Sequence, residues 1–221
     1  MPILGVIGGA GVGAAARLYE LVTARVRERT GALPRLVLWN LPLSDAIETA
    51  FTGAEPQPEV IAQVDALLAE AFERLLAAGA DLVAMPCNAL ARAAAREAAR
   101  RGVPFVDMIE ATVAGARGER ALLISTEATR AAGVYEGFGV EMLSPPEELR
   151  RESAALIRRA VSGELPSAAE MRDLVERARV PGASVVLGCT DICGLMAPAD
   201  AAALDVVESL AALADAVAAA L

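Results

Sequence analysis

The sequence predicts an α/β protein built from two pseudo-symmetric lobes, each a mainly parallel sheet flanked by helices. Short apolar runs of strand length alternate with longer helical patterns along the chain, and this alternation is typical of parallel sheets. One apolar run in each half leads to a cysteine, Cys87 or Cys189, and these lie about half the chain apart. Because ligands of such sheets gather at the carboxyl ends of strands, we expect the active site in the cleft between the lobes.

The first half contains four expected strands and the helices that connect them. Apolar runs place the strands at residues 3–7, 35–39, 82–85 and 102–106. Apolar residues at helical spacing place helices around residues 18–29 and at residues 59–78 and 88–101. Gly79 and Gly102 follow two of these helices, as expected at helix carboxyl ends.

The second half repeats this alternation. Strands are expected at residues 120–124, 140–143 and 183–187, and helices at residues 109–115, 146–162, 167–179 and 204–221. Ser167 and Glu170 have the spacing of a capping box at the start of one helix. We therefore expect a first lobe of residues 1–106, closed by the C-terminal helix in residues 206–221, and a second lobe of residues 107–205.

Composition argues against several classes of function. With 221 residues, 55% of them hydrophobic, the chain can bury a substantial core. The net charge of −9 and the lack of a basic cluster argue against nucleic acid or an anionic membrane as a partner. No apolar run reaches transmembrane length, and the start lacks the features of a signal peptide. We therefore expect a small-molecule partner.

The cysteine and histidine counts limit the chemistry. Three cysteines, an odd number, fit a reducing cytoplasm better than a disulfide framework. Histidine is absent, so acid–base chemistry falls to Cys, Asp, Glu, Lys, Arg or Tyr. Cys193 lies one helical turn after Cys189 and is expected to pack in the core, with a redox or metal role as the alternative. We expect no metal site, because no set of four ligands accompanies it.

Cys87 and Cys189 are candidate catalytic groups. Each stands at the carboxyl end of an expected strand and at the start of an expected helix. Unpaired backbone N–H groups and the positive end of the helix dipole favour a thiolate at such a place. The alternative is that each cysteine is a small buried hydrophobic residue. Their equivalent positions in the two halves favour the functional interpretation.

A glycine-rich loop at residues 8–13 joins the first strand to the first helix. Gly9, Gly11 and Ala14 formally satisfy a dinucleotide-binding fingerprint. The second strand, however, ends on Asn40, where such a site would need an acidic residue for the ribose, and no Gly-Lys-Ser/Thr sequence follows the loop. We therefore favour a loop that lets a small carboxylate approach the backbone.

Six short motifs occur in a characteristic order. They are Gly8-Gly9-x-Gly11, Met85-Pro86-Cys87-Asn88, Met108-Ile109-Glu110-x-Thr112, Thr126-x-x-Thr129, Val134-Tyr135-Glu136 and Gly188-Cys189-Thr190-Asp191. In order and spacing they resemble the aspartate/glutamate racemase superfamily, most of all its aspartate racemase branch, over essentially the whole chain. The resemblance implies a two-lobed, usually dimeric enzyme that racemises amino acids without a cofactor, through two cysteines on opposite sides of the α-carbon.

The resemblance also implies roles for single residues. The groups that would bind the substrate carboxylate and stabilise the carbanion are Gly9, Ala10, Gly11, Asn88, Thr126 and Thr190. Asp45 and Asp191 would lie beside the cysteines and poise or move protons, the alternative being exposed or helix-capping aspartates.

Two cysteines suit this chemistry for reasons independent of the resemblance. Inverting a carbon that bears a proton requires a base on one face and an acid on the other, with similar pKa values. Cysteine can serve in either role, because its ordinary pKa of about 8.5 falls toward neutrality at a helix amino end.

Three departures from the family pattern concern the substrate. Ala89 replaces the threonine of the first cysteine motif, and Ala46 and Val161 occupy the places of the arginine and lysine that bind the side-chain carboxylate in aspartate-specific members. An unpaired buried carboxylate is strongly penalised, so we do not expect aspartate as the substrate. Arg17 or Arg92 could substitute for these clamps, or could simply be solvated.

We therefore predict an isomerase: a cofactor-independent racemase or epimerase of an amino acid or a related α-substituted carboxylate. One alternative is another reaction of the same superfamily, a cis/trans isomerase or a decarboxylase in which one cysteine is the nucleophile or proton donor. A second alternative is a catalytically silent protein that binds a small carboxylate. We expect a homodimer in the cytoplasm.

Overall fold

The computed structural model describes residues 1–11, 13–51 and 57–221, and this part of the chain forms two four-stranded parallel sheets. The first sheet has the order β2-β1-β3-β4 and consists of β1 (Ile3–Gly8), β2 (Arg35–Asn40), β3 (Leu82–Ala84) and β4 (Phe105–Val106). The second has the order β6-β5-β7-β8 and consists of β5 (Arg120–Ile124), β6 (Glu141–Leu143), β7 (Ser184–Leu187) and β8 (Val206–Glu208). The two orders are equivalent, so the predicted fold of two similar α/β lobes is confirmed.

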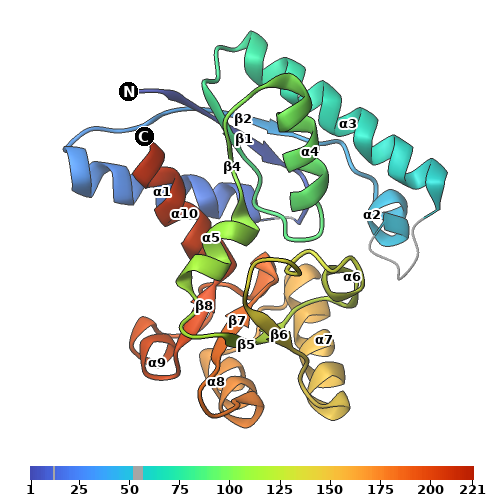
Figure 1. Ribbon diagram of the computed structural model, residues 1–221, viewed down its shortest axis with the longest axis vertical. Helices are drawn as coiled ribbons and strands as arrows, with labels where there is room; N and C mark the ends of the chain where they lie inside the picture. The colour runs from blue at the N-terminus through green and yellow to red at the C-terminus, as the bar shows by residue number, and fades with distance from the viewer. Residues whose placement is uncertain (12, 52–56) are drawn as a thin grey trace.

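The helices cover the two sheets and fill the space between them. In chain order they are α1 (Ala14–Thr30), α2 (Asp45–Phe51), α3 (Pro58–Ala77), α4 (Ala91–Arg101), α5 (Met108–Gly115), α6 (Glu127–Ala131), α7 (Glu147–Val161), α8 (Ala168–Ala178), α9 (Pro198–Ala203) and α10 (Ser209–Ala220), with a 3-10 turn η1 (Thr190–Ile192) after β7. Figure 1 shows the first lobe above the second, with α5 and α10 between them.

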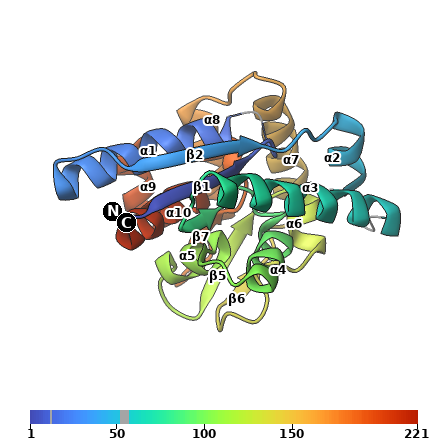
Figure 2. The ribbon, with the colours of Figure 1, turned by 90° about the horizontal axis from the view of Figure 1, so that it is seen from above.

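Alternation along β1 sends its side chains to two different layers of the first lobe. Leu4 and Val6 belong to a buried cluster that includes the inner face of α1. Ile7 belongs to a second cluster, made with the apolar face of α3. Figure 2 shows the result, with α1 on one side of β1 and β2 and α3 on the other.

The second sheet is covered in the same way. Leu122 and Ile124 of β5 lie in one cluster with residues of α7 and α8. Leu123, between them in the sequence, packs in another cluster with Ile109 and Val113 of α5. Both sheets are therefore buried on two faces, as expected for parallel sheets.

Helix α10 joins the two lobes. It packs against α1 of the first lobe and against α5, and its Leu213 and Val217 lie in the same buried cluster as Leu18 and Val22 of α1. That cluster also contains strand residues of both sheets, so the two lobes share apolar core rather than meeting only at a polar interface.

Some local features differ from the prediction. Residues 206–208, expected in a closing helix that completes the first lobe, form β8 and pair with β7 at the edge of the second sheet. The β-branched pair Val206 and Val207 favours a strand, and Asp205 before it has a positive φ of 52°, which separates it from α9. The short helices α6 and α9 were not predicted. The capping box of Ser167 and Glu170 is confirmed.

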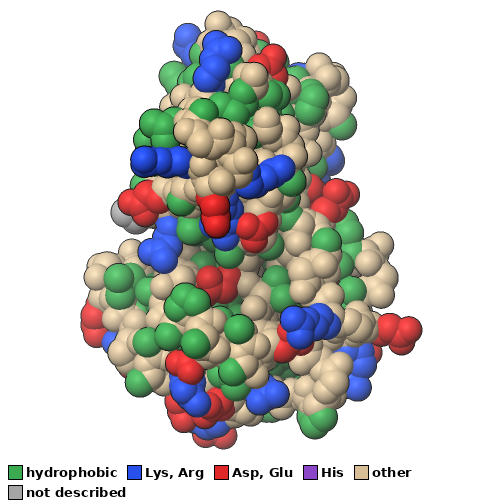
Figure 3. Space-filling model, turned by 90° about the vertical axis from the view of Figure 1, so that its left-hand side faces the viewer, with side chains coloured by type: hydrophobic (Ala, Val, Ile, Leu, Met, Phe, Trp, Pro, Cys, Tyr) green, Lys and Arg blue, Asp and Glu red, His purple; other side chains and the backbone are tan. Residues whose placement is uncertain are grey.

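The distribution of surface charge and the lengths of the helices can be compared with the composition. Figure 3 shows acidic and basic side chains interspersed on the face it presents. Within residues 1–11, 13–51 and 57–221, no helix is both long enough and apolar enough to span a bilayer.

Candidate functional site

Cys87 and Cys189 line the same small cavity between the lobes, with a volume of about 70 Å³. Its walls come from the segments that follow β1, β3, β5 and β7. These strands are the two central strands of the first sheet and the two central strands of the second. The lining residues are Ala10, Gly11, Cys87, Asn88, Ala89, Thr126, Thr129, Gly188, Cys189, Thr190 and Asp191. The carboxyl ends of equivalent strands therefore meet across this cavity.

The two cysteines occupy equivalent places but different environments. Cys87 follows the buried strand β3 and is half-buried, and its backbone N–H donates to the carbonyl oxygen of Met85 over 3.0 Å. Cys189 follows β7 and is buried, with 7% of its surface exposed. A small molecule in the cavity would therefore meet one partly open sulfur and one enclosed sulfur.

The predicted preference of Cys189 for its thiolate is wrong. Burial raises the pKa of the Cys189 thiol well above its usual range, and the nearby carboxylate of Asp191 raises it further. The segment after Cys189 is the three-residue turn η1 rather than an α-helix, so the dipole that could stabilise a thiolate is short. At neutral pH, Cys189 is a protonated thiol.

Asp191 lies beside Cys189 and next to Gly11 of the glycine-rich loop. The Cys189 thiol donates to Oδ2 of Asp191, with sulfur and oxygen 3.6 Å apart. Burial raises the pKa of Asp191, and the bond from Cys189 lowers it in part. Gly11 faces the same carboxylate, since a Cβ at this position would lie 3.4 Å from Oδ1 of Asp191.

Hydroxyl groups line the second lobe's side of the cavity. Thr126 is the N-cap of α6, where its hydroxyl oxygen accepts from the backbone N–H of Thr129 over 3.2 Å. The two threonine hydroxyls are 3.0 Å apart. Thr129 was not among the predicted site residues, although its spacing from Thr126 within one motif was the signal that could have identified it.

Asn88 has its side-chain amide engaged within the protein. The Tyr135 hydroxyl donates to Oδ1 of Asn88 over 2.6 Å, and Nδ2 of Asn88 donates to the Ser209 hydroxyl over 3.1 Å. Asn88 is buried. It lines the cavity while connecting the first lobe to two separate elements of the chain.

The sequence and fold agree with one known family. A model of the family described as Asp/Glu/hydantoin racemase matches residues 7–217. The chain belongs to this family.

Solved structures of proteins from the racemase family and of a decarboxylase share the fold. A candidate Asp/Glu racemase from Yersinia pestis matches with a TM-score of 0.79 and 22% identity, covering 100% of this chain and 99% of that one. An aspartate racemase homologue from Pyrococcus horikoshii OT3 matches with a TM-score of 0.74 and 21% identity, covering 97% and 96%. A double mutant of arylmalonate decarboxylase in its liganded form matches with a TM-score of 0.61 and 21% identity, covering 98% and 92%.

Gly9 and Cys193 of this racemase family member are not among the residues that line the cavity. Gly9 packs against the start of the loop after β2, where a Cβ would lie only 2.3 Å from the carbonyl oxygen of Leu41. Asp45 begins α2, and its side chain lies outside the described residues. Cys193 is buried in the core, as expected, and burial raises its pKa to about 12.

The two arginines considered as carboxylate clamps bind backbone instead. Arg17 donates to the carbonyl oxygen of Gly194 over 3.4 Å, and Arg92 donates to the carbonyl oxygen of Glu136 over 2.8 Å. Neither is among the described residues that line the cavity. The chain also contains no lysine.

A smaller apolar pocket adjoins the cavity of this racemase family member. It shares Ala10, Cys87 and Ala89 with the cavity and has a volume of about 20 Å³. Its other walls are the apolar side chains of Leu43, Phe51, Val64 and Leu90. An uncharged group attached to a molecule at Cys87 would fit against these side chains.

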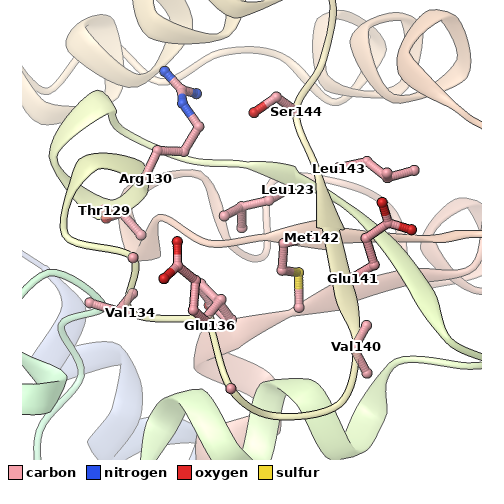
Figure 4. Close-up of a pocket in the computed structure, with 13 residues that line it drawn as sticks. Leu123, Thr129, Arg130, Val134, Glu136, Val140, Glu141, Met142, Leu143 and Ser144 are labelled. Atoms are coloured by element: carbon pink, nitrogen blue, oxygen red, sulfur yellow. The ribbon is translucent and has the colours of Figure 1, made fainter.

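Two larger hollows formed by the described residues are lined by neither candidate catalytic cysteine. The one in Figure 4, of about 370 Å³, lies over β5 and β6, with Arg130, Glu136 and Ser144 around it and Met142 inside. Another, of about 440 Å³, lies between α1, α7 and η1, and includes Val161, whose side chain is exposed.

Proposed function

We propose that this protein is a cofactor-independent racemase or epimerase of an amino acid or a related α-substituted carboxylate. Cys87 and Cys189 form its acid–base pair. The observation that carries the proposal is that both cysteines line one small cavity and come from equivalent strand ends of two similar lobes. Membership of the Asp/Glu/hydantoin racemase family supports the reaction class.

The raised pKa of Cys189 gives this cysteine the role of proton donor, which leaves the role of base to Cys87. In this proposal Cys87 starts as a thiolate: the bond between the α-carbon and its hydrogen breaks, and the proton moves to the Cys87 sulfur. Cys189, held as a thiol by its raised pKa, gives its proton to the opposite face of the carbanion. This leaves a thiol at Cys87 and a thiolate at Cys189, and exchange of protons with solvent, through Asp191 on the Cys189 side, restores the starting state.

The substrate carboxylate binds to neutral donors in this proposal. Ala10, Gly11, Thr126 and Thr190 line the cavity, and the backbone N–H groups of the first two and the hydroxyls of the last two are the donors in this proposal. Such donors stabilise the negative charge that develops on the carboxylate as the carbanion forms.

The substrate side chain is small and uncharged in this proposal. The apolar pocket beside Cys87 offers Leu43, Val64 and Leu90 as contacts, and no arginine or lysine is among the described residues lining this pocket or the cavity. A second carboxylate there would be desolvated without a partner, which costs more than the roughly 2–7 kcal/mol for burying an unpaired neutral polar group. The homodimer and the cytoplasmic location stay predictions.

A second candidate reaction is decarboxylation with a single proton-donating cysteine. The unequal environments of the two cysteines favour this alternative, since Cys189 is an enclosed thiol beside a carboxylate whereas Cys87 is partly open. Loss of CO2 from a disubstituted malonate leaves a carbanion that needs one proton and no base.

Proton exchange at the α-carbon separates the two reactions. The purified protein is incubated in D2O with single enantiomers of amino acids that have uncharged side chains, with aspartate for comparison, and with α-substituted malonates. Deuterium incorporation with inversion, followed by NMR and chiral chromatography, supports the racemase. Release of CO2 from a malonate without exchange of any amino acid supports the decarboxylase.

Single cysteine variants test whether racemisation needs both cysteines. Cys87→Ser and Cys189→Ser should each reduce racemisation by at least about 10³-fold, because the two groups act as a unit. If one variant retains full turnover, the two-cysteine mechanism is wrong.

A further inference from the structure

A buried series of hydrogen bonds runs between the two cysteine-bearing loops. Tyr135 donates to the side chain of Asn88 over 2.6 Å, and Asn88 donates to Ser209 over 3.1 Å. The Ser209 hydroxyl lies 3.8 Å from the sulfur of Cys193. The Cys193 thiol in turn donates to the backbone carbonyl oxygen of Cys189 over 3.4 Å. We call Tyr135, Asn88, Ser209 and Cys193 the inter-lobe bridge.

The members of the inter-lobe bridge come from distant parts of the chain. Asn88 directly follows Cys87 in the first lobe, whereas Tyr135 follows α6 in the second lobe and Cys193 follows η1. Ser209 is the first residue of α10, the helix that joins the lobes. All four are buried, with exposed fractions between 0% and 4%. The bridge therefore passes through Asn88, the neighbour of Cys87, and ends on the backbone of Cys189.

Buried polar groups that all find partners select one arrangement of the elements carrying them, because any other arrangement leaves a polar group unpaired. Such precision matters at this site, since a misplacement of about 1 Å in reacting groups can cost about 10²-fold in rate. We propose that the inter-lobe bridge fixes the position of the Cys87 loop relative to the Cys189 loop, and that Tyr135 and Ser209 are positioning residues for the reaction.

The bridge does not depend on pH in the neutral range. Burial raises the pKa of the Tyr135 phenol further above its usual value, so the hydroxyl stays protonated and remains a donor. The effect on turnover rests on the proposed function, because it requires both cysteines to act on one carbon. The effect on the positions of the two cysteine loops does not rest on the proposed function.

Thiol labelling tests the bridge without any assumption about the reaction. Tyr135→Phe and Ser209→Ala each remove one hydroxyl and keep the rest of the side chain. We expect the rate of iodoacetamide labelling at Cys87, followed by peptide mass spectrometry, to rise about 3- to 10-fold in both variants, because the loop opens more often. The matched controls Tyr19→Phe and Ser162→Ala change exposed residues outside the bridge and should label as wild type does.

Steady-state kinetics on a substrate identified in D2O provide the second readout. Each variant should lower kcat about 10- to 100-fold with a smaller change in KM, because the donors of the glycine loop and Thr126 lie outside the two loops that the bridge joins. The double variant should be no more than about twofold slower than either single variant, since one broken link already breaks the bridge. A purely structural role would lower the melting temperature and leave kcat unchanged.

The outcomes distinguish failure of this inference from failure of the proposed function. If wild type racemises but both single variants label and turn over normally, the bridge does not position the cysteines. If wild type acts on no substrate while labelling still rises in the variants, the bridge stands and the proposed reaction fails. Should Tyr135→Phe fail to fold, Ser209→Ala decides the labelling result alone.

Discussion

The thiol of Cys189 donates a hydrogen bond to the carboxylate of Asp191, with Sγ and Oδ2 3.6 Å apart. Burial raises the pKa of both groups. At neutral pH the proton of this pair is therefore on the Cys189 sulfur, and the neighbouring Asp191 oxygen can accept it. In the proposed reaction, this relationship makes Cys189 the proton donor.

Asp191→Asn should lower the pKa of Cys189, because the negative charge that opposes the thiolate is removed. The measurement is the pH dependence of iodoacetamide labelling at Cys189, followed by peptide mass spectrometry. The variant's labelling curve should move to lower pH than that of wild type. Asp65→Asn, an exposed change on α3, should leave the curve in place. A curve for Asp191→Asn that moves upward would contradict this account.

Stability should fall at alkaline pH because of the buried thiols. Burial raises the pKa of Cys189 and raises that of Cys193 to about 12, whereas an unfolded cysteine titrates near about 8.5. Above that pH the unfolded chain releases thiol protons that the folded protein keeps, so the unfolding free energy decreases. The slope is up to about 1.4 kcal/mol per pH unit for each buried thiol.

Urea unfolding between pH 7.5 and pH 10, in reductant, measures this slope. The chain contains no histidine and no lysine, so the proton release of unfolded thiols is not masked by those side chains in this range. Cys193→Ala should make the slope shallower by up to about 1.4 kcal/mol per pH unit. Ser162→Ala should not change it. Equal slopes in wild type and Cys193→Ala would show that the thiol is not held neutral by the fold.

Gly9→Ala should be much more destabilising than Gly31→Ala. Both glycines have positive φ, 89° and 73°, so both substitutions carry a backbone cost of about 1–2 kcal/mol. Only at Gly9 would the new Cβ lie 2.3 Å from the carbonyl oxygen of Leu41, whereas nothing lies within 4 Å at Gly31. Thermal or urea unfolding should show at least about 1 kcal/mol more loss at Gly9. Similar losses would mean that the loop adjusts freely.

Leu43→Ala should shift the substrate preference toward longer apolar side chains. Leu43 forms part of the apolar pocket beside Cys87, and each methylene accommodated in such a pocket is worth about 1–3 kcal/mol in specificity. The ratio of kcat/KM for a longer substrate to that for a shorter one should rise about 10-fold. Leu67→Ala, which removes a half-buried leucine outside the pocket, is the matched control and should leave the ratio unchanged.

The fold could be predicted largely from the sequence because its signals are local. Apolar strands, the glycines after helices and the pair Ser167 and Glu170 each act over a few residues. Residues 206–208 escaped prediction because two valines beside a long alanine-rich helix do not interrupt its apolar pattern. They form a strand because they pair with the edge of β7 that β5 does not occupy.

The candidate site could be predicted in outline but not in its electrostatics. The motif spacing identified Cys87 and Cys189, and both line the cavity. The pKa of Cys189 depends on how deeply the second lobe buries its sulfur, which the local sequence does not contain. The partners of Asn88 likewise lie 47 and 121 residues away in the chain, beyond any local pattern.

Helix α10 has a mechanical consequence for how a molecule reaches the cavity. It begins at the end of β8 in the second lobe and packs along α1 of the first, as Figure 1 shows. A wide hinge rotation would pull this apolar contact apart and expose Leu213 and Val217 to water. Small sliding movements along the helix would keep it buried, so admission of a ligand should proceed by shear between packed helices rather than by swinging the lobes open.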